Sequence, residues 1–444
     1  MIKQMLMKKV VLLNGLIALM LVGCSKSSDE AGGGAADDRT PIMLSLGTQQ
    51  PGITVDGPRT RGAGAIGVPG ADGTLGTWNG QKLKILAFRK NKISVEAADV
   101  EDIGAVGAWA TTTTQAAVSG LAWENGATLY YPIQNAYDFY GYYIDDAMNG
   151  DPVITPDTEG ADAIPGYVSI PVAIDGSQDL MVAKAELTDA QKAILDTYLD
   201  AGATDEEKEA MYARAYSSYT ARRGVQPQMM FKHLLSRLTV GVKAGTSEIV
   251  SAGQDGVYIT SLELTDVYNK GNMIVSVASQ KLEPVESSKT DGTLSLGIIG
   301  DNVADLTIDG ISFKGVKPTS TTDLVPIGES VMAMPGETSF NVAIKMRQVK
   351  DGKLLKTDEI PFESIVKAPA AKEMGEDGNP INIAKDENGN ILKDNKGNIL
   401  YRFLEGYTYY VKLTMNGLED IEITASLTPW KDGGDIPVTP GEDE

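Results

Sequence analysis

The single cysteine of this 444-residue chain, Cys24, closes an N-terminal segment that has the layout of a secretion signal. Three lysines come first, an apolar run from Val10 to Leu21 follows, and small residues precede the cysteine. The apolar run is shorter than the roughly 20 residues that a membrane-spanning helix needs. Leu21-Val22-Gly23-Cys24 has the pattern of a lipobox, in which the cysteine is acylated and becomes the mature N-terminus. A plain signal peptide with an incidental cysteine is the alternative.

The lack of a second cysteine constrains how the mature chain folds. Without a disulfide framework its domains have to be stabilised by ordinary hydrophobic cores, and about 420 residues suggest two of them. The 48 glycines, 20 prolines and 17 tyrosines favour β-structure with many turns. Removal of residues 1–24 takes away three lysines and no acid, so the formal charge changes from −21 to −24. Such a surface repels nucleic acid and anionic lipid, and neither is expected as a partner.

The first part of the mature chain is expected to be a flexible tether over residues 25–40, rich in Ser, Gly, Ala and Asp. The following stretch, 41–46, places Ile42, Leu44 and Leu46 on one face at period two, which predicts a short strand. A long Gly- and Pro-rich loop comes next and carries two arginines, Arg59 and Arg61. Loops of this length are usually functional or disordered.

The pattern from Gln81 onward predicts an all-β chain with one helical stretch. Thr188 with Gln191 and Thr204 with Glu207 are capping boxes that open helices near 188–200 and 204–221. These helices are expected as an insertion in a β-domain, with a helical linker between domains as the alternative. Strands are expected at 83–88, 128–131, 137–144, 180–183, 231–242, 257–264, 273–278, 338–347, 407–415 and 421–428.

Turn signals and alternation mark the C-terminal half. Two similar stretches, 386–390 and 394–398, contain Asn-Gly-Asn and Lys-Gly-Asn and predict hairpin tips. Neither fits the EF-hand spacing, so a calcium site is not expected. The stretch from 421 shows the clearest alternation, with one face formed by Ile421, Ile423, Ala425 and Leu427.

The residues offer little for catalysis. His233 is the only histidine and the only cysteine is the lipidation candidate, so Ser-His, Cys-His and His-based zinc sites are not expected. No glycine-rich phosphate loop is present. Asp145-Asp146 is an adjacent acid pair of the kind that 60 acidic residues produce by chance. The sequence therefore predicts no enzyme activity, no catalytic residue, no metal and no cofactor.

The remaining chemistry is that of strand pairing. If the strand at 41–46 fills a slot in the first domain, a cut after Arg59 or Arg61 leaves it held by noncovalent contacts alone. Its departure would open an apolar groove with unpaired backbone groups, which recruits another strand. The alternating C-terminal segment has the pattern that such a groove accepts. The alternative is that both ends pair within one molecule.

Several short motifs, in order along the chain, resemble those of the fimbrillin family of Bacteroidales, the type V pilins. They cover nearly all of the mature chain: the lipobox at Cys24, Arg61-Gly62, Trp78-Asn79-Gly80, Tyr130-Tyr131-Pro132, the run 137–143, Asp179-Leu180-Met181-Val182-Ala183, the run 231–238, and Leu427-Thr428-Pro429-Trp430. The resemblance implies a mainly β fold with two transthyretin-like Greek-key β-sandwich domains and a helical insertion near the end of the first.

The resemblance also implies an architecture and a life cycle. The expected parts are a lipoprotein signal peptide (1–24), a tether (25–40), a removable strand and cleavage loop (41–61), a first domain (62–228), a second domain (229–420) and a donor strand with its tail (421–444). Cys24 would carry acyl chains such as palmitate, an arginine-specific protease would cut after Arg61 or Arg59, and Ile42, Leu44 and Leu46 would plug the groove. Ile421, Ile423, Ala425 and Leu427 would be the donor side chains.

The expected function is that of a structural subunit of a cell-surface fimbria (pilus) that supports cell adhesion. The precursor would sit in the outer membrane through its lipid, and the trimmed subunit would polymerise by donor-strand exchange. Its partners would be further copies of the chain and accessory, tip and anchor subunits. Alternatives are a surface glycan-binding lipoprotein and an accessory or tip adhesin of the same family.

Overall fold

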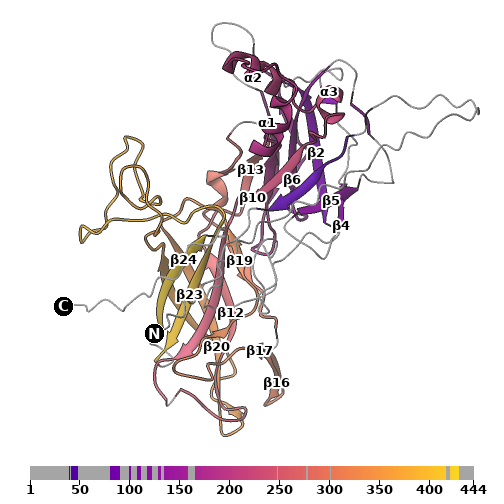
Figure 1. Cartoon of the computed structure of the whole chain (residues 1–444). Coiled ribbons are helices and arrows are strands. Elements are labelled where there is room, and N and C mark those ends of the chain that lie inside the picture. The colour runs from indigo at the N-terminus through magenta and orange to yellow at the C-terminus, as the bar shows by residue number, and fades with distance from the viewer. Residues whose placement is uncertain are drawn as a thin grey trace, which may run out of the picture. The chain divides into compact units, whose positions relative to one another are not determined.

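The structure is a computed structural model, and it describes most of the chain from Thr40 to Pro429 (Figure 1). The described residues are 40, 42–48, 81–90, 100–101, 108–111, 118–122, 129–131, 135–158, 166–247, 249–276, 279–300, 302–416 and 421–429. Among them, no helix is long and apolar enough to cross a membrane.

Strands dominate the described chain, as expected. In the first half they are β1 (Ser45–Thr48), β2 (Lys82–Arg89), β3 (Val100–Glu101), β4 (Ala108–Thr111), β5 (Val118–Ala122), β6 (Tyr137–Tyr143), β7 (Val153–Thr155), β8 (Tyr167–Ala173) and β9 (Met181–Lys184). In the second half they are β10 (Gln228–His233), β11 (Ser236–Ala244), β12 (Gly256–Thr265), β13 (Lys270–Ile274), β14 (Lys281–Pro284), β15 (Thr293–Leu296), β16 (Ala304–Ile308), β17 (Ile311–Gly315), β18 (Val325–Pro326), β19 (Val331–Ala333), β20 (Ser339–Lys350), β21 (Lys353–Leu354), β22 (Ile360–Lys367), β23 (Tyr407–Met415) and β24 (Ile421–Pro429).

The helices begin where the capping boxes predict them, but the second ends at Tyr212 instead of continuing to residue 221. Helix α1 (Asp189–Asp196) begins after Thr188 and α2 (Asp205–Tyr212) after Thr204, and both capping boxes are formed. A short third helix, α3 (Ser218–Ala221), follows, and a 3-10 turn η2 (Glu286–Ser288) lies further along the chain. Figure 1 shows α1, α2 and α3 grouped beside the sheet that holds β2, β6 and β10. That they are an insertion in a β-domain, and not a linker between domains, stays a prediction.

The first sheet has eight strands in the order β3-β2-β4-β5-β1-β10-β9-β6. Strand β2 also pairs with β6, from Lys84↔Tyr142 to Arg89↔Tyr137, so the last strand of the order pairs with the second one. The pairings β2-β4-β5-β1-β10-β9-β6 therefore form a closed ring. β1, the strand nearest the N-terminus, is one of its members, and any loss of β1 would open the ring.

The C-terminal half contains two larger sheets, ordered β18-β11-β23-β24 and β15-β12-β20-β21, with β19 and β22 pairing β11 and β20. Side chains of β20 alternate between two faces, and the inward face is buried in the core. It consists of Phe340, Val342, Ile344 and Met346. β11 runs parallel to β23 over eight residue pairs. This mainly β, multi-sheet arrangement is consistent with the β-sandwich expectation.

A further sheet, β14-β13-β8-β7, joins the two halves of the chain. β8 pairs antiparallel with β13 from Lys270↔Ala173 to Ile274↔Ser169. The pairing continues past the strand ends, because Val275 N–H donates to Val168 O at 2.9 Å. Strands from either side of the expected boundary at 228/229 therefore share one ladder.

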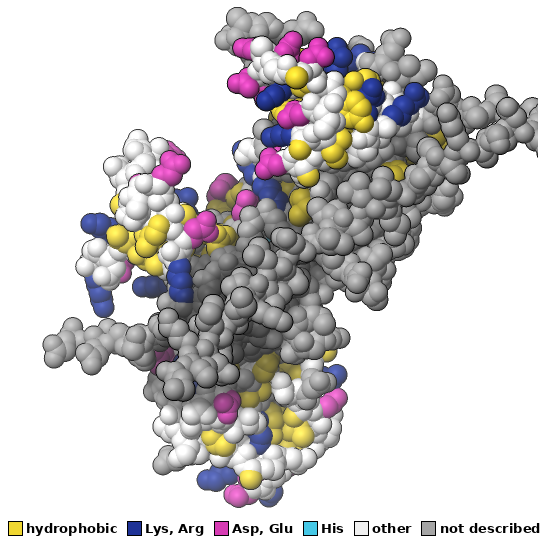
Figure 2. Space-filling view, in the orientation of Figure 1, with side chains coloured by type: hydrophobic (Ala, Val, Ile, Leu, Met, Phe, Trp, Pro, Cys, Tyr) yellow, Lys and Arg dark blue, Asp and Glu magenta, His cyan; other side chains and the backbone are white. Residues whose placement is uncertain are grey.

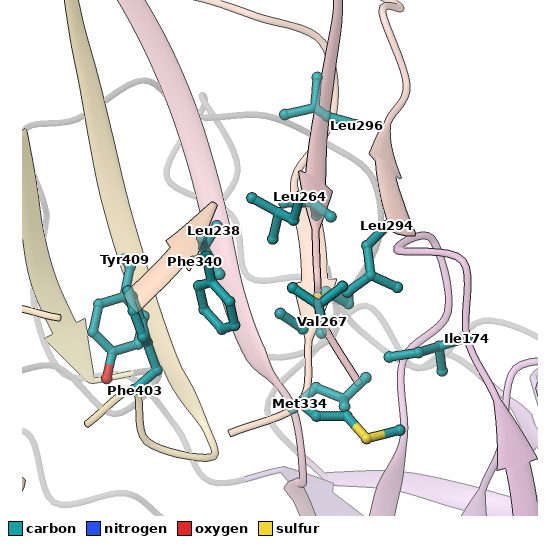
Figure 3. Close-up of a cluster of buried hydrophobic side chains, with 14 of the residues drawn as sticks. Ile174, Leu238, Leu264, Val267, Leu294, Leu296, Met334, Phe340, Phe403 and Tyr409 are labelled. Carbon is teal, nitrogen blue, oxygen red and sulfur yellow. The ribbon is translucent and has the colours of Figure 1, made fainter. Parts of the chain in front are cut away.

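The largest core also draws on both halves. It includes Ile170 and Val172 of β8 together with Leu264 and Met273 from later strands. Three of its aromatic rings are in contact: the centroids of the tilted pair Phe340 and Phe403 are 4.4 Å apart, and those of the edge-on pair Phe403 and Tyr409 are 4.6 Å apart. Figure 3 shows these rings beside the aliphatic side chains, among them Ile174 from the first half.

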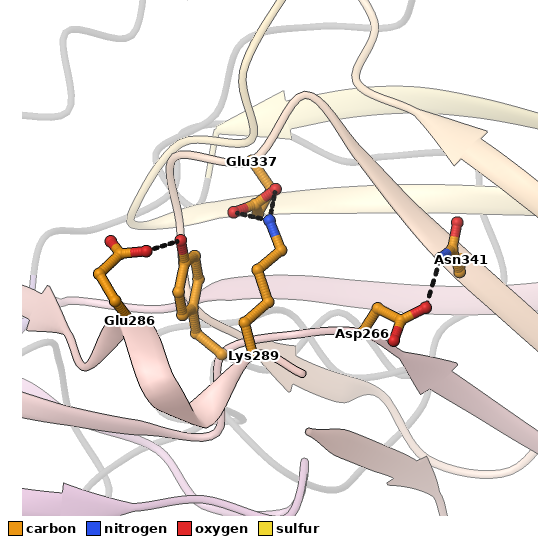
Figure 4. A network of polar contacts seen from close by, with 6 residues as sticks. Asp266, Glu286, Lys289, Glu337 and Asn341 are labelled. Carbon is orange, nitrogen blue, oxygen red and sulfur yellow. Dashed lines mark hydrogen bonds and ion pairs between the residues drawn. The ribbon is translucent and has the colours of Figure 1, made fainter. Parts of the chain in front are cut away.

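Polar contacts at the edge of this core fix the turn at η2. Lys289 Nζ lies 2.9 Å from both carboxylate oxygens of Glu337, and Tyr268 OH donates to Glu286 at 2.9 Å (Figure 4). The Asn341 amide donates to Asp266 at 2.9 Å, across the start of β20. These contacts connect segments that are 18 to 75 residues apart in the sequence.

Three expected strands differ from the structure. The stretch 231–242 is divided between β10, which ends at His233, and β11, which begins at Ser236. The stretch 128–131 forms only an isolated bridge at Tyr130, and the N-terminal strand spans Ser45–Thr48 instead of 41–46. Upstream of β1, Met43 N–H donates to the side chain of Gln226 at 3.3 Å. The tips at 386–390 and 394–398 are confirmed as turns, closed by the bridges Lys385↔Ile391 and Lys393↔Ile399.

Candidate functional site

The N-terminal segment, defined here as Thr40 and residues 42–48, fills a slot in the first sheet. Ile42 and Leu44 are 3% and 6% exposed, whereas Met43 between them is 61% exposed. The predicted alternation therefore places Ile42 and Leu44 on the buried face. Leu46 lies in β1, opposite Met229 and Ser119, but its side chain is outside the described ones.

Backbone hydrogen bonds occupy both edges of the slot. β1 runs parallel to β10, from Ser45↔Gln228 to Thr48↔Phe231, and antiparallel to β5. Upstream of β1, Ile42 N–H donates to Leu129 O at 2.8 Å, and Tyr131 N–H donates to Thr40 O at 2.9 Å. Removal of the segment would leave these groups of β5, β10 and residues 129–131 without their partners, which is the condition that recruits another strand.

The floor of the slot is apolar. Ile42 and Leu44 belong to a buried cluster to which β2, β6, β9, β10 and the helices contribute Leu83, Ile85, Phe139, Met181, Ala183, Leu195, Met211, Met229 and Phe231. Burial of a Leu or Ile side chain contributes roughly 1.5–3 kcal/mol. Two described side chains of the segment therefore contribute about 3–6 kcal/mol to its retention.

Side chains from the connection between α3 and β10 hold the same segment. Arg222 Nε donates to Thr40 Oγ1 at 2.7 Å. Gln226 Oε1 accepts from Met43 N–H at 3.3 Å and from Tyr131 OH at 3.2 Å. The sequence reasoning missed both residues, because this stretch has no periodicity and was expected to be a domain boundary.

The proposed cleavage and lipid sites, Arg59, Arg61 and Cys24, lie outside the described residues. The structure therefore places only the strand that a cut after Arg59 or Arg61 would separate from the rest of the chain. Arg59 lies eleven residues beyond the end of β1 at Thr48.

The expected donor strand is β24, which lies in a different sheet from β1. It pairs antiparallel with β23 over nine residues, from Met415↔Ile421 to Tyr407↔Pro429, and it is the last strand in the sheet order. Ile421 is buried and Ile423 and Ala425 are half-buried against the main core. The backbone of Leu427 pairs with Tyr409, while its side chain is not among those described.

His233 takes part in a buried polar group at the end of β10. Its Nδ1 lies 2.9 Å from the Asp179 carboxylate, and both side chains are nearly inaccessible. Asp179 N–H in turn donates to Asp145 at 3.1 Å, and Tyr143 OH donates to Asp145 at 2.6 Å. Burial raises the pKa of the Asp145 carboxyl against these hydrogen bonds. These hydrogen bonds make the group a packed polar element at the end of β10.

The rest of the described surface offers no metal centre, since no group of three His, Cys, Asp or Glu side chains converges there. Figure 2 shows apolar side chains among basic and acidic ones on the helical segment. The most exposed rings there are Tyr198 and Tyr219, at 50% and 38%. The Arg223 guanidinium lies over both rings, 4.8 and 3.5 Å from their centroids.

This geometry defines the class of the protein as a mainly β chain whose first sheet incorporates its own N-terminal strand. The sequence model of the fimbrillin-like family matches residues 71–430, and the chain belongs to that family. No curated protein has a significantly similar sequence.

Similar solved structures come from Bacteroides and Porphyromonas species. They include a candidate cell adhesion protein from Bacteroides uniformis, at 13% identity and TM-score 0.41, with 89% of this chain and 99% of that chain covered. Two from Porphyromonas gingivalis are the tip fimbrial protein Mfa3, at 11% identity and TM-score 0.30 with 88% and 100% covered, and the fimbrial anchor protein Mfa2, at 10% identity and TM-score 0.28 with 88% and 98% covered.

Proposed function

We propose that this chain is a structural subunit of a cell-surface fimbria that supports adhesion, and that it polymerises by exchange of β-strands. The observation that carries the proposal is the position of the N-terminal segment in the first sheet. Its strand β1 lies between β5 and β10 and pairs with both. Membership of the fimbrillin-like family supports the same function. No step of this function needs enzyme chemistry in the subunit itself.

In the proposed pathway, Cys24 is acylated and holds the precursor at the outer membrane. An arginine-specific protease then cuts after Arg61 or Arg59, which frees β1 from the covalent chain. Departure of the segment opens the edges of β5 and β10 together with the apolar floor beneath Ile42 and Leu44. A strand from another subunit fills the vacancy and restores these contacts.

The proposed donor is β24, with Ile421, Ile423, Ala425 and Leu427 as its apolar face. In the single chain β24 is an edge strand that pairs with β23 on one side. Its release therefore breaks one ladder and not two. The lost contacts with β23 are replaced by two ladders in the slot of the next subunit. This gain in paired backbone groups and buried apolar surface would favour the polymer over the free subunit.

The cleavage step is tested by the double variant Arg59→Ala/Arg61→Ala. The expected product is a lipidated, uncut monomer, because β1 then stays covalently attached in its slot. Cell-surface fractions run on unboiled gels should lose the polymer ladder. A normal ladder from this variant would exclude cleavage at these arginines.

The donor step is tested by two truncations of a subunit that starts at residue 62. A chain that ends after Pro429 keeps β24 and is expected to polymerise. A chain that ends after Asp420 lacks β24, and it should not polymerise alone but should bind added subunits as an acceptor. Loss of polymerisation in the first truncation would assign the donor to residues 430–444 and contradict the role of β24.

A glycan-binding function has one observation in its favour. The exposed rings of Tyr198 and Tyr219 resemble the aromatic platforms on which sugars stack, and Arg223 supplies donors beside them. Retardation of the protein in glycan-containing gels that is lost in Tyr198→Ala/Tyr219→Ala, without any filaments, would favour this second function.

A further inference from the structure

The helical segment and the N-terminal segment are connected by a small set of polar contacts. Arg222 and Gln226, which we call the clasp, lie between α3 and β10. Each donates to or accepts from the N-terminal segment, at positions where that segment has left the strand ladder. They therefore add side-chain contacts to the part of the segment upstream of β1, where the backbone pairs with residues 129–131.

Gln226 is the centre of the clasp because it contacts three different elements. Its Oε1 accepts from Met43 N–H of the segment and from Tyr131 OH on the opposite side of the slot, and its own carbonyl accepts from Gln191 Nε2 of α1 at 2.7 Å. Tyr131 is 3% exposed. One residue thus links three parts: its side chain contacts the slot wall and the segment, and its backbone carbonyl contacts the helix.

The contact with Met43 uses the backbone and not the side chain. Met43 is 61% exposed, so its amide would face water if Gln226 did not accept from it. The Arg222 contact is made to a side chain, the hydroxyl of Thr40. Thr40 is 7% exposed, and a buried hydroxyl needs a hydrogen-bond partner. The clasp therefore satisfies one exposed and one buried polar group of the same segment.

The link to α1 makes the helices part of the arrangement. Gln191 uses both ends of its amide: Oε1 accepts from Thr188 N–H in the capping box, and Nε2 donates to Gln226 O. Leu195 of α1 and Met211 of α2 belong to the same buried cluster as Ile42 and Leu44. Displacement of the connection would consequently disturb the helices and the floor of the slot together.

We propose that the clasp of Arg222 and Gln226, anchored on α1 through Gln191, retains the N-terminal segment after the chain has been cut, so that release requires the helical segment to move. The inference rests on the proposed function, because it assigns the control of strand release within that pathway. It makes α1 to α3 a regulatory element and not an inert insertion.

The first test needs neither cleavage nor assembly. Hydrogen exchange of the uncut chain is followed by mass spectrometry in peptides that cover residues 40–48. Gln226→Leu should raise the exchange rate there about tenfold, the effect expected for loss of roughly one hydrogen bond. Gln226→Glu keeps an acceptor oxygen and should exchange like the parent.

Matched variants separate the clasp from general destabilisation. Arg222→Met should accelerate exchange over residues 40–48, whereas Arg223→Met should not, because Arg223 contacts Tyr219 and Tyr198 instead of the segment. Gln191→Glu preserves the acceptor of the capping box and removes the donor to Gln226 O. It should accelerate exchange over residues 40–48 without loss of helix signal in circular dichroism.

The second test follows the segment after cleavage by an arginine-specific protease. In the parent the cut peptide should co-elute with the body of the protein in size-exclusion chromatography, and Gln226→Leu should release it about tenfold faster. Equal release and equal exchange in parent and Gln226→Leu would overturn the clasp. Both readouts are independent of fimbria formation, so failure of the proposed function would show separately as parent protein that is cut and emptied but forms no polymer.

Discussion

At the scale of single residues, Gly141 in β6 packs closely against the buried cluster that contains Ile42 and Leu44. A Cβ there would lie 2.8 Å from Phe231 Cζ, 3.0 Å from Met229 Cε and 3.1 Å from Ile85 Cδ1. All three atoms are ends of buried side chains that would have to shift. We expect Gly141→Ala to lower the free energy of unfolding by about 1–3 kcal/mol, measured by urea denaturation.

A matched control for this prediction lies on the surface. At Gly375 an added Cβ meets only Asp377 Oδ1 at 3.1 Å and a carbonyl at 3.7 Å, and its backbone has no positive φ. Gly375→Ala should therefore leave stability nearly unchanged. Equal stability in the two variants would mean that the core relaxes around Gly141 at no cost.

Asp145 gives a prediction about pH. Burial raises its pKa above the ordinary value of 3.8, although hydrogen bonds from Tyr143 and from the backbone of Asp179 oppose the change. The folded state therefore binds this proton more tightly than the unfolded state, and the parent gains stability as the pH falls through the raised pKa. Asn cannot take up that proton, so the stability of the parent relative to Asp145→Asn should increase from pH 7 towards pH 4.

The measurement is a pair of urea unfolding series from pH 7 to pH 4. The backbone of Asp145 is left-handed, with φ of 43°, and Asn tolerates this conformation better than most residues. The difference between the two curves isolates the contribution of this carboxyl from that of other acids. A difference that shrinks as the pH falls would contradict the raised pKa.

At the scale of elements, the helices depend on their capping boxes. Thr188 Oγ1 accepts from Gln191 N–H at 3.2 Å and Thr204 Oγ1 accepts from Glu207 N–H at 3.3 Å. We expect Thr188→Ala to destabilise the protein by about 1 kcal/mol, because α1 is anchored in the core through Leu195. The checks are chemical denaturation and the helical signal in circular dichroism.

Thr188→Ser serves as the control, since it keeps the hydroxyl and should restore most of the stability. The comparison also bears on the clasp, because Gln191 belongs to both structures. If Thr188→Ala and Thr188→Ser unfold at the same urea concentration, the cap contributes nothing measurable to this fold.

The same elements show how far local pattern predicts structure. The capping boxes and the strands with strict alternation lie where the sequence placed them, because these signals depend on neighbours within one turn or one ladder. The stretch around Tyr130 failed as a strand, since its pairing depends on the N-terminal segment far away in the sequence. The alternation of Ile42, Met43 and Leu44 was visible in the sequence. Gln226 has no local signal, because its partner Met43 lies 183 positions away along the chain.

At the scale of the whole molecule, contacts between distant segments decide which parts of the chain can fold. The sequence, through its family resemblance, indicated a domain boundary between residues 228 and 229. It could not indicate that β8 and β13, about 100 residues apart, share a ladder, because neither strand carries information about its partner. Nor could it predict that Asp179 and His233, 54 residues apart, lie 2.9 Å from each other.

This shared ladder predicts that the two halves of the chain do not fold separately. Fragment 62–228 would leave β8 without β13 and expose Ile170 and Val172, while fragment 229–444 would leave β13 without β8. Each lost ladder also exposes an edge that promotes aggregation. We expect both fragments to be insoluble when expressed alone and to form a soluble pair when expressed together, as measured by co-purification through a tag on one fragment. Two soluble, cooperatively folding fragments would instead mean that the β8–β13 ladder is dispensable and that each half has a sufficient core of its own.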